Sequence, residues 1–169
     1  MKKVRAVYHD PDLVRAQTVF GDSVLGLETA KLIIQTKVRN CRLELFGYAR
    51  SRRRAGSDQS KFLETIGGEL WRWEQLLNGV VSKERVFQLE ALAAKDYWEA
   101  VGLICCQKED WRRIYPHATD ILNILLNTGY LTLARKCRKT LLESGLLIEL
   151  GILHGKNSRS PLVYDVMEI

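Results

Sequence analysis

The sequence predicts an all-α helical bundle with at most a short N-terminal strand, and three observations support this. Apolar residues make up 46% of the 169 residues, which is enough to form a buried core. Only three prolines occur, at positions 11, 116 and 161, so long stretches run without a helix breaker. In these stretches apolar residues recur with the period of about 3.6 residues that is typical of helices. We expect a short segment or remnant strand over residues 1–9 and one helical domain over residues 10–169.

Three helices are expected in the first half of the chain. The first covers about residues 12–20, because Pro11 suits a first helical turn and the segment 21–23 (Gly-Asp-Ser) ends it. The second covers about residues 25–54, where apolar residues recur at helical spacing until the polar segment 55–58. The third covers about residues 59–77, and Asn78-Gly79 marks the turn that follows it.

Three further helices are expected in the second half. Ser82 is a good N-cap for a helix over about residues 83–106. A helix over about residues 117–143 ends before Gly145, since glycine commonly follows the C-terminus of a helix. Ser160-Pro161 starts a last, short helix that runs to Ile169.

Positive charge is concentrated in the first third of the chain. Residues 1–54 hold twelve Lys or Arg and five Asp or Glu, a net charge of +7, whereas residues 55–169 hold fourteen and fifteen, a net charge of −1. This asymmetry favours a polyanionic partner, with nucleic acid ahead of a membrane surface, and the alternative is a solvated basic helix face. No apolar run reaches the roughly 20 residues of a membrane span, and the N-terminus lacks the apolar part of a secretory signal. We therefore expect a cytoplasmic protein.

Glu90 is a carboxylate on the apolar side of the expected helix 83–106. Gln88, Lys95 and Glu99 form one narrow polar stripe, and Glu90 points roughly 200° away from Gln88. A largely desolvated carboxylate is rare unless it is paired with a basic side chain or binds a metal ion. The pattern leaves both alternatives open, an ion pair with a Lys or Arg of another helix and a metal ligand.

A second group of chemistry-bearing residues lies near the C-terminus. His154 follows an apolar run and is either a core histidine or a ligand. Asp165 and Glu168 are three residues apart on the last helix and therefore share a face. An imidazole nitrogen together with carboxylate oxygens is a mixed donor set that suits Mn²⁺ or Mg²⁺.

A set of ordered motifs resembles the family of CRISPR-associated spacer-acquisition integrases. Residues 89–98, LEALAAKDYW, resemble the family's E-G-x-A-A-x-x-Y-W helix, and residues 120–130, DILNILLNTGY, resemble D-P-x-N-A-L-L-N-x-G-Y. Residues 145–154, GLLIELGILH, resemble G-L-D-P-x-L-G-F-L-H, and residues 161–168, PLVYDVME, resemble S-L-x-x-D-L-M-E. Residues 37–45, KVRNCRLEL, resemble K-I-x-N-Q-R-x-L-L. The motifs follow the family's order, which makes the set far more specific than any one of them.

The resemblance implies that the fold is the helical catalytic domain of this family, and it assigns roles to four residues. The family's catalytic glutamate falls on Glu90, its metal-binding histidine on His154 and its last acidic ligand on Glu168. Asp165 is the neighbouring acid, either a further ligand or a residue that orients one. All four are candidate catalytic and metal-site residues, with Mg²⁺ or Mn²⁺ as the implied cofactor.

Several features depart from the family pattern. Ala91 replaces the usual glycine after the catalytic glutamate, Ile148 replaces a common proline, and Glu168 stands where many members have Asp. The usual N-terminal β-domain is reduced to at most residues 1–8, and the helical tail beyond the last motif is absent. This resembles miniature integrases of prokaryotes, which work without the usual small ferredoxin-like partner, and implies that no second CRISPR-associated protein is needed.

The activity that the resemblance implies is metal-dependent integration of short spacer DNA into a CRISPR repeat array. A 3′-hydroxyl attacks a phosphodiester and another 3′-hydroxyl leaves, so no nucleotide cofactor is needed. Joining two ends of double-stranded DNA requires two active sites, which implies a homodimer or homotetramer. Two alternatives stay open: a metal-dependent endonuclease or branched-DNA resolving enzyme, and a catalytically silent DNA-binding paralogue.

Basic residues on the second and fifth expected helices and near the C-terminus are expected to contact DNA phosphates. These residues are Lys37, Arg39, Arg42, Arg50, Arg52, Arg53, Arg54, Lys136, Lys139, Lys156 and Arg159.

Overall fold

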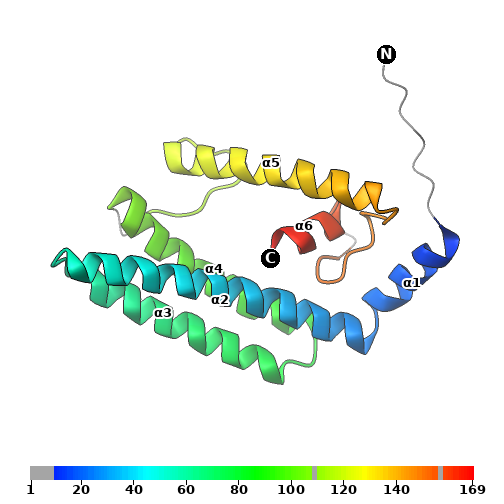
Figure 1. Cartoon of the computed structure of the whole chain (residues 1–169), viewed down its shortest axis with the longest axis horizontal. Helices are drawn as coiled ribbons and strands as arrows, with labels where there is room; N and C mark the ends of the chain where they lie inside the picture. Colours follow the sequence, from blue (N-terminus) through cyan, green and yellow to red (C-terminus); the bar gives the residue numbers. More distant parts are fainter. Residues whose placement is uncertain (1–9, 108–109, 156–157) are drawn as a thin grey trace, which may run out of the picture. The chain divides into compact units, whose positions relative to one another are not determined.

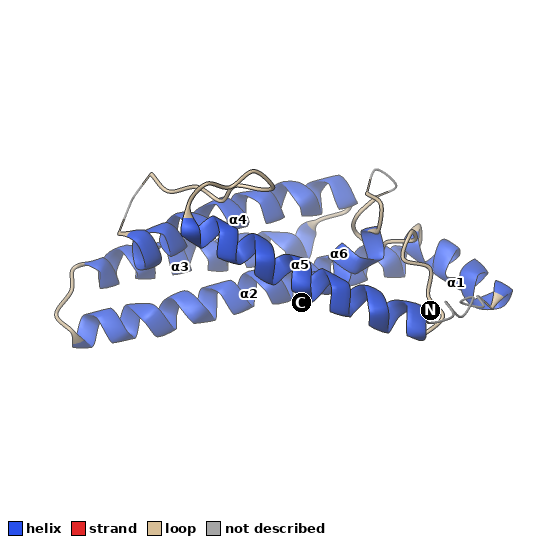
Figure 2. Ribbon diagram, turned by 90° about the horizontal axis from the view of Figure 1, so that it is seen from above, coloured by secondary structure: helices blue, strands red, loops and turns tan. Residues whose placement is uncertain are grey.

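The computed structural model describes residues 10–107, 110–155 and 158–169, and the regular structure of these residues is entirely helical (Figure 1, Figure 2). In chain order the helices are α1 (Pro11–Gly21), α2 (Val24–Arg54), α3 (Gln59–Leu76), the 3₁₀ helix η1 (Leu77–Gly79), α4 (Lys83–Cys106), α5 (Ile121–Glu143) and α6 (Pro161–Met167). The predicted all-α class is confirmed. The expected N-terminal segment, residues 1–9, lies outside the described residues. No described helix is both long and apolar enough to cross a membrane.

Two predicted helix ends are wrong. The fifth helix begins at Ile121 rather than near residue 117, because Asp120 caps it by accepting a hydrogen bond from the backbone N–H of Asn123 at 3.0 Å. The last helix ends at Met167 rather than Ile169, and Glu168 forms its C-cap.

Asn123 ties the irregular segment before α5 to the helix itself. Its side chain is fully buried. Its Nδ2 donates to the carbonyl oxygen of Arg112 at 2.8 Å and to Asp120 Oδ2 at 2.8 Å, and its Oδ1 accepts from the backbone N–H of Ile114 at 2.9 Å. The indole N–H of Trp111 also donates to Asp120. These bonds satisfy backbone groups that a helix would otherwise have satisfied.

The chain divides into two compact units. The first consists of the chain up to Ala30 together with Thr128–Ile169, and the second is Lys31–Asn127. The boundaries fall within α2 and within α5, so the first unit is discontinuous in sequence.

The second unit is built on α3, α4 and the part of α2 that follows Ala30. Polar links between these helices include Arg42 to Glu74 at 3.1 Å, Trp73 to Asp96 at 2.7 Å, and Tyr97 to Glu44 at 2.8 Å. The large side chains that these helices bury most completely are Ile34, Leu45, Leu63, Leu70, Val86 and Leu89. The unit therefore combines an aliphatic core with polar bridges at its edges.

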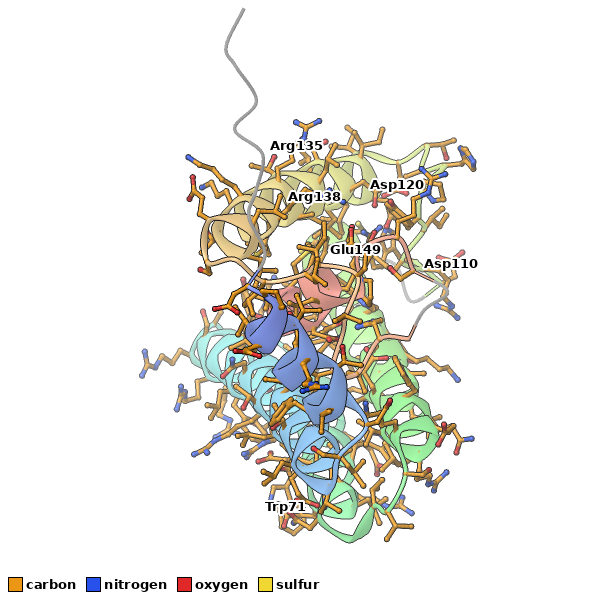
Figure 3. All side chains as sticks on the ribbon, turned by 90° about the vertical axis from the view of Figure 1, so that its right-hand side faces the viewer. Trp71, Asp110, Asp120, Arg135, Arg138 and Glu149 are labelled. Carbon is orange, nitrogen blue, oxygen red and sulfur yellow. The ribbon has the colours of Figure 1, made fainter. Side chains whose placement is uncertain are left out.

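The first unit contains α1, the part of α5 after Asn127, α6 and the loop between the last two helices. Its core consists of Leu141, Ile148, Leu162 and Val163. Arg138 of α5, labelled in Figure 3, donates a hydrogen bond to the hydroxyl of Ser160 at the start of α6. The core and this bond attach α6 to α5 within the unit.

Gln17 on α1 anchors the loop that leads to His154. Its Nε2 donates to the carbonyl oxygens of Leu147 at 2.7 Å and Leu150 at 3.0 Å. Its Oε1 accepts from the backbone N–H of Leu147 at 3.1 Å. A single amide side chain therefore fixes the path of this loop from the opposite end of the sequence.

We predict that Asn123→Ala destabilises the protein by about 2–4 kcal/mol, because it leaves several buried polar groups without partners. Urea unfolding followed by circular dichroism measures this. Arg135→Ala, at an exposed position on α5, is the control and should stay within about 0.5 kcal/mol of the parent protein. A loss for Asn123→Ala no larger than that of the control would contradict the role of this side chain.

The Asp120 cap predicts a pH dependence of stability. Hydrogen bonds from the backbone and side chain of Asn123 lower the pKa of Asp120 to about 2. A carboxyl whose pKa is lowered on folding stabilises the protein above its unfolded-state pKa of about 3.9, and this contribution is lost as the pH falls towards 2. The difference in urea midpoint between the parent protein and Asp120→Asn should therefore be largest near pH 5 and shrink towards pH 2. A difference that does not change with pH would contradict this.

Candidate metal centre

The end of the chain brings three of the predicted site residues together. His154 lies at the end of the loop after α5, Asp165 lies on α6, and Glu168 is the C-cap of α6. His154 Nδ1 is 2.8 Å from Asp165 Oδ1, and His154 Nε2 is 4.0 Å from Glu168 Oε1. The imidazole therefore lies between the two carboxylates.

Asp165 is almost completely buried, with 1% of its side chain exposed, and both of its oxygens are engaged. Oδ2 accepts hydrogen bonds from the backbone N–H groups of Ile152 and Leu153. Oδ1 accepts from the backbone N–H of His154 at 2.9 Å and faces its ring Nδ1. With both oxygens committed in this way, the geometry favours the orienting role for Asp165 over the role of a further metal ligand.

Gly151 allows the loop to close around this carboxylate. A Cβ atom at position 151 would lie 2.5 Å from the carbonyl oxygen of His154, 2.7 Å from Pro161 Cβ and 2.9 Å from Asp165 Oδ2. No side chain larger than hydrogen fits without displacing backbone. The glycine of the family-like motif thus has a direct steric reason at this position.

His154 is held with one nitrogen turned to Asp165. In a neutral imidazole, a hydrogen bond to the Asp165 carboxylate places the ring proton on Nδ1 and leaves the lone pair on Nε2. About a quarter of the His154 side chain and a fifth of the Glu168 side chain are exposed, at 26% and 20%. Nε2 of His154 and Oε1 of Glu168 are therefore two donor atoms near the surface that are suited to Mg²⁺ or Mn²⁺.

Glu90 belongs to the second unit, on α4, where it pairs with Lys37 of α2. Lys37 Nζ is 2.6 Å from Glu90 Oε1, and the two side chains are 26% and 21% exposed. Of the two alternatives that the pattern leaves open, the ion pair with another helix is present. The sequence singles out both residues, but its basic pattern predicts a DNA phosphate contact for Lys37.

The described residues include no group of three or more His, Cys, Asp or Glu side chains arranged to hold a metal ion. Within the first unit, hydrogen bonds engage both oxygens of Asp165, and His154 and Glu168 offer further donor atoms. The ligand roles of Glu90, His154 and Glu168 stay predictions.

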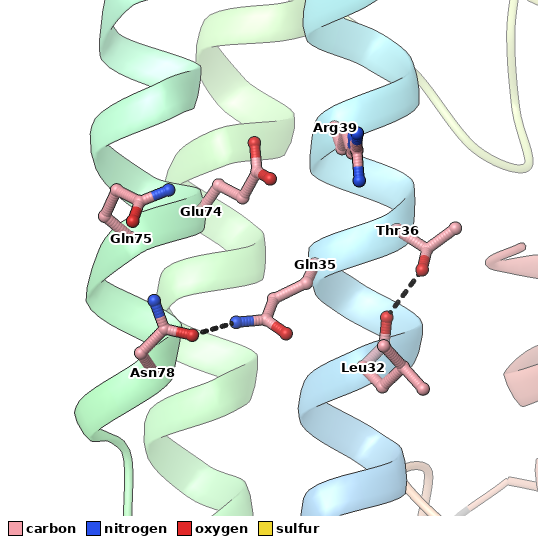
Figure 4. A pocket seen from close by; sticks show the side chains of 7 residues that line it. All are labelled: Leu32, Gln35, Thr36, Arg39, Glu74, Gln75 and Asn78. Carbon is pink, nitrogen blue, oxygen red and sulfur yellow. Dashed lines mark hydrogen bonds between the residues drawn. The ribbon is translucent and has the colours of Figure 1, made fainter.

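A small polar pocket of about 230 Å³ lies between α2 and α3 in the second unit (Figure 4). It is lined by Leu32, Gln35, Thr36, Arg39, Glu74, Gln75 and Asn78. Gln35 donates to Asn78 Oδ1 at 2.7 Å across it. None of the four candidate catalytic residues lines this pocket.

The basic residues expected to contact DNA fall into two groups. Four form ion pairs: Lys37 with Glu90, Arg42 with Glu74, Arg53 with Glu64, and Lys139 with Glu143. The others within the described residues are exposed or partly exposed: Arg39, Arg50, Arg52, Arg54, Lys136 and Arg159. Lys156 lies outside the described residues. Lys37 and Arg42 are only partly exposed, and their partners Glu90 and Glu74 lie on neighbouring helices.

The all-helical fold and the Asp-oriented histidine beside a glutamate agree with the class that the ordered motifs resemble, the helical domain of a CRISPR-associated protein. Residues 5–169 match the family model described as "CRISPR associated protein Cas1". The chain therefore belongs to the Cas1 family, as its motifs predict.

Curated relatives agree with this membership. The chain is 30% identical over 163 residues to "CRISPR-associated endonuclease Cas1 1" of Archaeoglobus fulgidus, a match that covers 88% of this chain and 47% of the relative. It is 29% identical over 157 residues to "CRISPR-associated endonuclease Cas1" of Korarchaeum cryptofilum, covering 85% and 45%. The chain thus spans about half the length of these relatives.

The fold is similar to a chain of the "Cas6-RT-Cas1--Cas2 complex", with a TM-score of 0.80 and 21% identity over 93% of this chain and 17% of that one. A chain of the "Partial Cas6-RT-Cas1--Cas2 complex" matches with a TM-score of 0.76 and 21% identity over 92% and 45%. The predicted fold, the helical domain of this family, is confirmed.

We predict that Gly151→Ala destabilises the protein by about 1–3 kcal/mol, because the added methyl group must displace backbone around Asp165. Gly155→Ala is the matched control in the same loop, since a Cβ at position 155 meets no atom within 4 Å. Thermal and urea unfolding of the two variants measure the difference. Equal effects of the two substitutions would contradict the steric requirement at position 151.

Proposed function

We propose that this chain is the catalytic domain of a divalent-metal-dependent DNA integrase that inserts short spacer DNA into a CRISPR repeat array. The observation that carries the proposal is the orientation of His154 by the buried Asp165, with Nε2 beside Glu168 Oε1. A neutral imidazole with a fixed tautomer, next to a carboxylate, is what a metal-dependent phosphodiester chemistry requires.

The proposed reaction is a transesterification. A DNA 3′-hydroxyl attacks a phosphodiester, one phosphorus–oxygen bond forms and one breaks, and the leaving 3′-hydroxyl takes the proton, so bonds and charges balance without a nucleotide cofactor. Bound Mg²⁺ or Mn²⁺ would stabilise negative charge on the phosphate and activate the attacking oxygen.

Different residues of the chain would bind the metal ion, orient a ligand and contact DNA. Glu90, His154 and Glu168 are the proposed ligands, and Asp165 keeps the proton of His154 on Nδ1 so that Nε2 can donate its lone pair. Exposed arginines and lysines, including Arg39, Arg50 and Arg54 on α2, would hold DNA phosphates. Because two DNA ends are joined, we propose a homodimer or homotetramer.

Endonuclease activity is the second candidate, and it is favoured by the names of the curated relatives from Archaeoglobus fulgidus and Korarchaeum cryptofilum. In this case water replaces the 3′-hydroxyl as the nucleophile at the same site, and branched DNA is a further substrate. Cut but unjoined product separates this reaction from integration. A silent DNA-binding paralogue is the weaker candidate, because a pure binder has no need of carboxylates beside phosphates.

Whether the chain requires a partner protein is tested separately in the same assay. The resemblance to miniature integrases predicts activity of the chain alone. The structural relatives, in contrast, come from complexes that contain Cas2. Integration is therefore measured with the chain alone and with a Cas2-type protein added.

We predict that the protein joins short duplex DNA to a repeat-containing plasmid in Mg²⁺ or Mn²⁺ and that Glu90→Gln or His154→Ala lowers the rate about 100-fold or more, because several kcal/mol of charge stabilisation is lost. Gel analysis of end-labelled DNA measures joined and cut products separately. DNA affinity of the two variants should stay within about twofold of the parent, since neither removes a phosphate contact. Joined product in excess chelator, or from His154→Ala at the parent rate, would sink the proposal.

A further inference from the structure

The ion pair between Lys37 and Glu90 joins α2 to the proposed ligand on α4. Nζ of Lys37 and Oε1 of Glu90 are 2.6 Å apart, a short charge-assisted hydrogen bond. We infer that Lys37 is a positioning residue, which fixes the Glu90 carboxylate through Oε1 and so presents Oε2 as the donor to the divalent metal ion. This inference rests on the proposed function for the role of Glu90 as a ligand.

Lys37 binds one of the two carboxylate oxygens of Glu90, which leaves the other oxygen for a metal ion. Lys37 contacts only one of the two carboxylate oxygens, and within the described residues Oε2 of Glu90 makes no hydrogen bond or ion pair. A carboxylate without such a partner rotates about its side-chain torsions. With Oε1 held, the direction of the remaining lone pairs is fixed before a metal ion arrives, and less ordering is needed on binding.

Both ends of the pair are carried by well-packed helix segments. On α2, Ile34 lies about one turn before Lys37 and is 0% exposed, and Val38 follows Lys37 and is 2% exposed. Leu89 and Ala93, which flank Glu90 on α4, are 1% and 3% exposed. The backbone positions of the two partners are therefore set by a packed interface, and the flexibility that remains lies in their side chains.

Other basic residues on α2 differ from Lys37 in their exposure or in their ion-pair partner, and this difference distinguishes a positioning role from a DNA contact. Arg39 is exposed, as a phosphate contact requires. Arg42 is paired like Lys37, but its partner Glu74 is not a proposed ligand. The ion pair of Lys37 ends on a proposed ligand, so removal of Lys37 should change metal binding more than DNA binding.

The test compares Lys37→Met, Lys37→Arg and Glu90→Gln in the full chain. Tyr97→Phe is the matched control, because it removes another polar link between α4 and α2, to Glu44 at 2.8 Å, without touching Glu90. Mn²⁺ binding without DNA is measured from the electron paramagnetic resonance signal of free Mn²⁺. Affinity for a labelled duplex is measured across a salt series, and kcat and KM of strand transfer are measured at saturating metal.

Lys37→Met should weaken Mn²⁺ binding about 10-fold or more and lower kcat, while KM for DNA and the salt slope stay unchanged. Lys37→Arg, which keeps the charge and a donor, should recover part of the Mn²⁺ affinity, and Tyr97→Phe should bind Mn²⁺ like the parent. If Lys37 were only a nearby positive charge, its removal would strengthen Mn²⁺ binding, and that result overturns the inference. A loss of about 0.9 in the log–log salt slope with unchanged Mn²⁺ binding would identify a phosphate contact instead and also overturns it.

Glu90→Gln separates this inference from the proposed function. If Glu90→Gln binds Mn²⁺ as tightly as the parent, Glu90 is not a ligand and the proposed function loses that residue. If Glu90→Gln weakens Mn²⁺ binding while Lys37→Met does not, only the positioning role fails. Should Lys37→Met unfold, as shown by circular dichroism, Lys37→Gln gives the same test: weaker Mn²⁺ binding supports the positioning role, and equal or tighter binding overturns it.

Discussion

One buried carboxylate determines the structure of the His154 loop in the first unit. Asp165 is 1% exposed and receives hydrogen bonds from three consecutive backbone N–H groups as well as facing His154 Nδ1. A buried negative charge is tolerable only when its oxygens are satisfied, so the loop must wrap around it. The turn at Gly151, the path of residues 152–154 and the orientation of the imidazole all follow from this single requirement.

Two further side chains hold this arrangement from outside. Gln17 fixes the loop at Leu147 and Leu150, and Arg138 fixes the start of α6 at Ser160. Both side chains set where the loop and α6 begin. The candidate metal centre of the first unit is therefore a property of packing and backbone hydrogen bonds as much as of its donor atoms.

Helical periodicity predicts most of this fold, because α2, α3 and α4 bury regular apolar faces. Periodicity does not predict the start of α5. There the side chain of Asp120 caps the helix instead of continuing it, and it is held by contacts to Asn123 and Trp111 that exist only in the folded chain. The motifs single out the candidate residues, but spacing gives no means to separate an orienting acid from a ligating one. Asp165 becomes distinct only through its burial. Similarly, sequence shows that Glu90 needs a partner without showing that Lys37 provides it.

The discontinuous first unit has a consequence for how the protein is made. The second unit, residues 31–127, is complete in sequence once residue 127 has been synthesised, and it can fold as a chain with local contacts. By contrast, α1 cannot make its hydrogen bonds through Gln17 until the loop at Leu147, more than a hundred residues later, has been synthesised. The second unit can therefore fold before the His154 loop is closed. A chain interrupted between residue 127 and this loop would carry the basic helix α2 and its neighbours without the histidine and the two carboxylates that surround it.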